Sequence, residues 1–70
     1  MPIAMIDSGA EVKVLRINGS DEVRQHLSEL GFVADSEVRV VSNTNGNVIV
    51  MVKGSRVALD KSMAMRVIVG

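Results

Sequence analysis

The chain has 70 residues, eight Lys and Arg against eight Asp and Glu, no cysteine and a single aromatic residue, Phe32. This length predicts one domain, residues 1–70, with a small core, because such a chain buries only about 60% of its unfolded surface. The lack of cysteine excludes disulfides and thiolate sites, and zero net charge with one aromatic argues against a nucleic-acid-binding protein, which needs basic and stacking side chains.

The first predicted element is a strand over residues 11–17. The chain contains 13 valines and 5 isoleucines against 4 leucines, and β-branched side chains favour strands. Within this segment Val12 and Val14 share one face, whereas Leu15 and Ile17 share the other. A change of face inside one strand predicts a bulge or a sharp coil.

One helix is predicted over residues 20–30. Val23, Leu27 and Leu30 are spaced to form a single apolar stripe. Ser20 is a favourable N-cap residue, and Gly31 stands where a helix C-terminus needs a left-handed backbone.

Four further strands are predicted from alternating apolar residues. They cover residues 37–40, 48–52, 57–59 and 63–69, and the last of them includes Met63 and Met65. Asn45-Gly46 predicts a type I′ hairpin turn between two of these strands, and residues 53–55 predict a second reversal.

This order of elements predicts a mainly β protein, an SH3-like small barrel of about five strands with one helix inserted between strands 1 and 2. Short strands in so small a chain avoid exposed edges by closing into a barrel. An OB-like barrel is the alternative, although its helix usually comes later in the chain.

The sequence resembles the FeoA family across nearly its whole length. The resemblance rests on Leu27-x-x-Leu30-Gly31-Phe32 after a short helix, on Val57-Ala58-Leu59, and on a closing Ala64-x-x-Val67-x-Val69. It implies an SH3-like barrel, a cytoplasmic location and a part in bacterial ferrous iron uptake through the membrane transporter FeoB, which has a guanine-nucleotide-binding domain. The same domain type occurs at the C-terminus of iron-dependent repressors.

Two loop positions depart from that resemblance. Asp35 stands where many members have Gly, and Asn47 stands where many have Pro. Asp tolerates left-handed dihedral angles better than most residues, so we expect the turn at Asp35 to survive.

The best candidate metal ligands are Glu22, His26 and Glu29. Helix geometry places all three on one flank of the predicted helix, and imidazole with carboxylates suits a divalent transition ion such as Fe²⁺. The alternative is a solvated helix face that binds no cofactor. This alternative is favoured because Glu and His side chains at this spacing are common on helix surfaces. A thioether site for Cu(I) at Met51, Met63 and Met65 is a weaker hypothesis than methionines filling the core.

No catalytic constellation is visible, so the sequence predicts a protein that acts by contact and not an enzyme. We expect Arg24, Gln25 and Ser28, opposite the apolar stripe, to bind the FeoB partner, with the strand surface around Arg39 and Arg56 as the competing site. A metal-sensing regulatory module and a nucleic-acid-binding barrel are the alternative functions. The sequence predicts no oligomeric state.

A cytoplasmic location without membrane insertion is also expected. The longest strictly apolar run, residues 48–52, is far below the roughly 20 residues of a spanning helix. The first residues lack the basic and apolar regions of an export signal.

Overall fold

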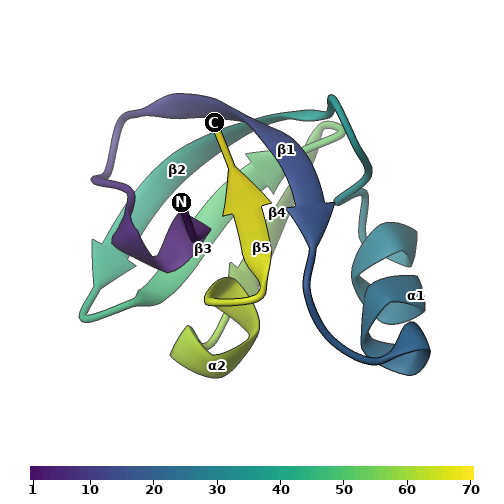
Figure 1. The fold of residues 1–70 in the computed structure, drawn as a ribbon. Coiled ribbons are helices and arrows are strands. Elements are labelled where there is room, and N and C mark those ends of the chain that lie inside the picture. Colours follow the sequence, from purple (N-terminus) through teal and green to yellow (C-terminus); the bar gives the residue numbers. More distant parts are fainter.

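The computed structural model describes residues 1–70 and contains five strands in one antiparallel sheet. The elements in chain order are η1 (Ile3–Met5), β1 (Glu11–Ile17), α1 (Asp21–Glu29), β2 (Glu37–Thr44), β3 (Asn47–Val52), β4 (Ser55–Leu59), α2 (Lys61–Ala64) and β5 (Val67–Val69). The sheet order is β4-β3-β2-β1-β5, and the sheet curls so strongly that its two faces become the inside and outside of a small barrel (Figure 1). The predicted SH3-like architecture, with a helix between strands 1 and 2, is confirmed.

β1 changes partner along its length, which is how the sheet turns its corner. Its first residues pair with β2, whereas Val14 pairs with Val69 and Ile17 with Val67 of β5. The register shifts between Val14 and Arg16, and the intervening Leu15 is exposed. The bulge predicted from the change of face is therefore present.

The core lies inside the curled sheet and draws side chains from almost every element. Val48, Val50 and Val52 of β3 all point inward and are at most 1% exposed. Their neighbours Ile49 and Met51 point outward, as the alternation predicts. The other core residues include Ile3, Val14, Leu27, Phe32, Val38, Val40, Leu59, Ala64, Val67 and Val69.

Both hairpin turns lie where the sequence predicts them. Asn45 and Gly46 have positive φ values of 54° and 94°, which a type I′ turn requires. Lys53 and Gly54 have φ values of 52° and 77° and form the turn between β3 and β4. Asp35, with φ of 69°, also adopts the left-handed conformation expected of it.

The prediction of one strand over residues 63–69 is wrong for its first half. Asp60 caps the short helix α2, because its Oδ1 accepts a hydrogen bond of 2.9 Å from the backbone N–H of Met63. β5 begins only at Val67. Met65 is consequently 41% exposed and does not fill the core. The cap outweighs the period-2 pattern because it satisfies a backbone donor at the helix start.

Candidate functional site

The position of α1 is set by hydrogen bonds at both of its ends. At the start, Ser20 Oγ accepts from the backbone N–H of Val23 at 3.3 Å. At the end, Gly31 N–H donates to Ser28 O at 2.9 Å and Phe32 N–H donates to Leu27 O at 3.1 Å. This pair of bonds is a Schellman motif, which ends a helix with a left-handed residue; Gly31 fills that place with φ of 109°.

The same motif fixes which side of α1 faces the barrel. Leu27 and Phe32, which bracket the Schellman bonds, are both fully buried and belong to the core. Val23 and Leu30 of the predicted stripe are half-buried against it. The Leu-x-x-Leu-Gly-Phe segment therefore acts as an anchor that presents the opposite side of α1 to solvent.

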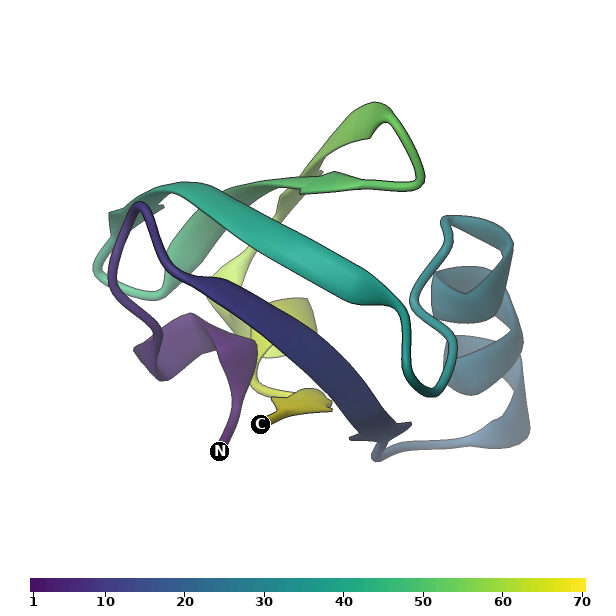
Figure 2. The same ribbon diagram turned by 90° about the horizontal axis from the view of Figure 1, so that it is seen from above.

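Arg24, Gln25 and Ser28 lie on that opposite side, and all three are exposed. We call these three residues the α1 face. Arg24 forms an ion pair with Asp21 one turn earlier, which is the single ion pair of the chain. Exposed pairs of this kind contribute at most about 1 kcal/mol, so the guanidinium can exchange its partner at little cost. Figure 2 shows α1 set to one side of the curled strands, away from both termini.

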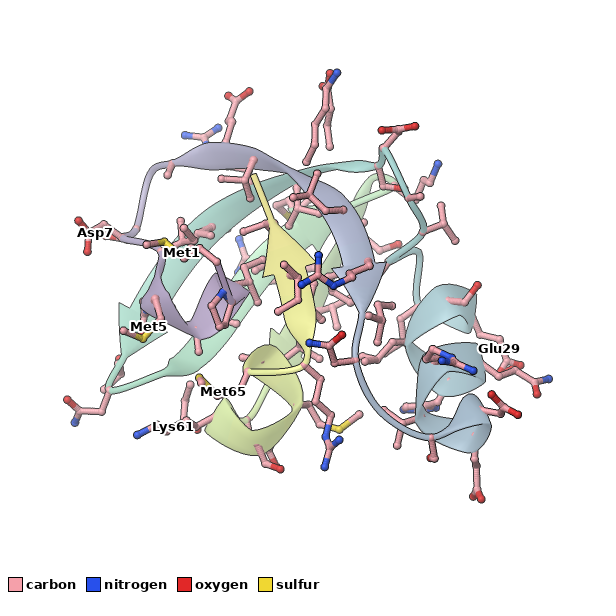
Figure 3. The ribbon with its side chains drawn as sticks, viewed as in Figure 1. Met1, Met5, Asp7, Glu29, Lys61 and Met65 are labelled. Atoms are coloured by element: carbon pink, nitrogen blue, oxygen red, sulfur yellow. The ribbon has the colours of Figure 1, made fainter.

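A hollow between α1 and α2 gathers the predicted metal ligands. Glu22, His26 and Glu29 all line it, so the three side chains lie on one flank of α1. The remaining lining residues of this α1–α2 hollow are Ser20, Val23, Gln25 and Met63. Figure 3 shows Glu29 on α1, on the opposite side of the molecule from Met1 and Met5.

The ligand candidates do not converge within the hollow. No group of three or more His, Asp or Glu side chains in the structure is close enough together to hold a metal ion. The donor types suit a divalent transition ion, but binding one would require side-chain rotation, which exposed side chains on a helix surface permit at small cost.

The three methionines considered as thioether ligands lie on different surfaces. Met63 lines the α1–α2 hollow, whereas Met51 lies on the outer face of β3 between Arg39 and Arg56. Met65 lies at the C-terminal end of α2 (Figure 3). The structure therefore does not bring them together.

Met63 is the one residue of the hollow that the sequence did not associate with α1. The missed signal is Asp60, an N-cap residue whose helix turns Met63 toward α1. Neither α1 nor α2 has the length and hydropathy that a membrane-crossing helix requires.

Known proteins are similar to this chain along its whole length. The model of the FeoA domain matches residues 1–70. A protein of Methanocaldococcus jannaschii named Fe(2+) transport protein A is 35% identical over 68 residues, which cover 97% of this chain and 83% of the relative.

Solved structures show the same agreement. The crystal structure of an iron uptake regulatory protein, FeoA, superimposes with a TM-score of 0.92 at 30% identity, over 99% of this chain and 93% of that chain. FeoA of Stenotrophomonas maltophilia, described as an SH3 domain protein complexed with zinc, superimposes with a TM-score of 0.85 at 32% identity, over 100% of this chain and 89% of that chain. A manganese-dependent transcriptional repressor shares the fold alone, with a TM-score of 0.88 at 22% identity over 99% of this chain and 39% of that chain. This chain belongs to the FeoA family.

Proposed function

We propose that this protein is an accessory protein of ferrous iron uptake, which binds the cytoplasmic region of a FeoB-type transporter and modulates transport without a reaction of its own. Membership of the FeoA family supports the link to iron transport. The observation that supports this contact surface is the exposure of the α1 face, which the Schellman motif at the end of α1 directs away from the barrel. This proposal places the protein in the cytoplasm.

The chemistry of the α1 face suits recognition by polar contacts. It combines one guanidinium with an amide and a hydroxyl, and none of these groups contributes to the core. Arg24 can leave Asp21 for a carboxylate or backbone carbonyl of the partner, because the exposed pair is weak. A helix whose apolar side is already buried contributes a rigid surface, which lowers the entropy lost on binding.

The experiment is to measure the affinity of the purified FeoB cytoplasmic region for this protein and for two charge reversals. Arg24→Glu is expected to weaken binding about tenfold or more, because it places like charge at a polar contact. Arg39→Glu, on the outer face of β2, is the matched control and should bind as the unaltered protein does. Melting temperatures should stay equal, since both side chains are exposed.

Two results would overturn the proposal. If Arg39→Glu abolishes binding while Arg24→Glu does not, the interface lies on the strands. If the unaltered protein does not bind the FeoB region at all, the adaptor function itself is wrong.

Metal sensing is the second candidate function, and the α1–α2 hollow favours it. Glu22, His26 and Glu29 line that single hollow, and a relative of 32% identity has been described in complex with zinc. An ion bound there would alter α1 beside the proposed partner surface. Titration with Fe²⁺ tests this candidate: amide shifts confined to the three residues favour sensing, and unchanged amides favour a pure adaptor.

A further inference from the structure

The two edge strands of the sheet differ in whether another segment pairs with their outer side. The β5 edge is covered by the N-terminal residues: Val69 N–H donates to Met1 O at 2.8 Å, and Pro2 forms a bridge with Ile68. β4 forms the other edge and pairs only with β3. An uncovered edge of this kind is a template for another strand.

The register identifies which backbone groups of β4 are available. Val52 and Ser55 flank the two-residue Lys53-Gly54 turn and are therefore a hydrogen-bonded pair. Bonded and non-bonded pairs alternate along an antiparallel ladder. Arg56 and Ala58 are consequently non-bonded, and their N–H and C=O groups project away from β3.

The side chains beside this edge divide into a basic and an apolar position. Arg56 lies opposite Met51, with Arg39 next in the row across the sheet, and these three line one groove on the outer face. Ala58 lies opposite Ile49, which is 36% exposed, and this pair lines a second groove.

The charge of this edge is unbalanced. Glu11 of β1 lies across from Arg39, but the neighbour of Arg56 on β3 is Met51, and Arg56 forms no ion pair. Lys53, in the turn before β4, adds a second cation, and the strand itself, Ser55–Leu59, carries no carboxylate. The one carboxylate beside it is Asp60, which follows the strand and caps α2. A second copy of β4 could bring only Asp60 to Arg56, and the Oδ1 of Asp60 already accepts the N–H of Met63 as the N-cap of α2, whereas an acidic segment would bring carboxylates that are free to pair.

We propose that the β4 edge binds an extended acidic peptide segment of a partner protein as an added antiparallel strand. An acidic side chain lies beside Arg56, and an apolar side chain two residues earlier lies beside Ala58 and Ile49. The residue between them faces Val57, which packs on the core, so it is apolar as well. This mode takes affinity from main-chain bonds and specificity from alternate side chains. The proposal does not depend on the α1 face, so either can fail without the other.

The first test uses the peptide acetyl-Thr-Val-Val-Glu-Thr-Glu-amide with the full ¹⁵N-labelled chain at low salt. Amide shifts should concentrate on residues 55–59 and on Ile49 and Met51, and exchange of the Arg56 and Ala58 amides should slow. A matched peptide with both glutamates changed to lysine should bind at least about tenfold more weakly, because the favourable charge pairing is reversed. N-methylation of the first glutamate should have a similar effect, because it removes a main-chain donor.

Variants of the protein provide the second test. Ala58→Pro removes an N–H that points away from the sheet, a position where edge strands tolerate proline, and should reduce binding at least about tenfold. Ala58→Thr keeps the N–H and should retain binding. Arg56→Glu should lose the acidic peptide and gain the lysine peptide.

The proposal is overturned if the lysine peptide binds the unaltered protein as well as the acidic one does. It is equally overturned if the shifts fall on α1, if Ala58→Pro folds and binds normally, or if no shift appears at millimolar peptide. Shifts of residues 55–59 that depend on protein concentration alone would assign the edge to a second copy and also contradict it.

Discussion

Asn43 on β2 holds the carbonyl of Ala4, 39 positions earlier in the chain, through a hydrogen bond of 2.9 Å from its Nδ2. The same amide nitrogen donates to Ile6 O at 2.7 Å, and Asn43 Oδ1 accepts from Gly46 N–H at 2.9 Å. One side chain thus joins the segment around η1 to the hairpin turn between β2 and β3. Because it uses both the amide nitrogen and the amide oxygen, a side chain without an amide cannot satisfy all three partners.

Asn43→Asp should lower the free energy of unfolding by about 1–3 kcal/mol, because it removes both donors and places a carboxylate against two carbonyl oxygens. Urea denaturation measures the change. Asn45→Asp introduces the same charge two residues away, at an exposed turn position, and should cost less than about 1 kcal/mol. Equal losses for the two variants would show that the three bonds of Asn43 contribute nothing specific.

Val50→Asp should unfold the chain at 25 °C. Val50 is fully buried on β3, and an unpaired carboxylate there costs several kcal/mol, a large share of the stability of so small a domain. Ile49→Asp is the matched control, because its side chain lies on the outer face. Amide dispersion in a ¹⁵N spectrum should be lost in the first variant and kept in the second; the reverse pattern would contradict the register of β3.

Gly46→Ala should destabilise the protein more than Gly54→Ala does. Both glycines have positive φ, so both variants carry the same type of backbone strain, about 1 kcal/mol. A Cβ at Gly46 would lie 2.7 Å from Lys61 Cγ, whereas a Cβ at Gly54 would meet nothing within 4 Å. Thermal unfolding should show the larger fall in melting temperature for Gly46→Ala, and equal falls would mean that the Lys61 side chain moves aside freely.

His26→Ala tests the metal hypothesis through stability. If the flank is only solvated, adding Fe²⁺ under anaerobic conditions should leave the melting temperatures of the unaltered protein and the variant unchanged. An ion that binds only the folded state must raise the melting temperature. A rise that is present in the unaltered protein and absent in the variant would therefore favour sensing over the pure adaptor.

Much of the barrel could be predicted because its signals are local. The turn at Asn45-Gly46, the Ser20 cap and the alternation along β3 each involve residues within a few positions of one another. The bulge in β1 was also visible, as a change of apolar face.

The elements that escaped prediction depend on distant contacts. η1 has no periodic pattern, and it is held by Asn43 and by burial of Ile3 and Ala4. A similar limit applies to the candidate site. Helix spacing places Glu22, His26 and Glu29 on one flank, but Met63 reaches the hollow only because α2 replaces the expected strand.

The pairing of Val14 with Val69 has a consequence for the order in which the protein folds on the ribosome. β2, β3 and β4 are neighbours in sequence and can pair as a meander soon after they emerge, because the loops to be closed are short. β1 is synthesised before all three, yet the strand that pairs with its second half is synthesised last. Val14 and the inner face of the meander therefore remain accessible to chaperones and proteases until β5 has left the exit tunnel.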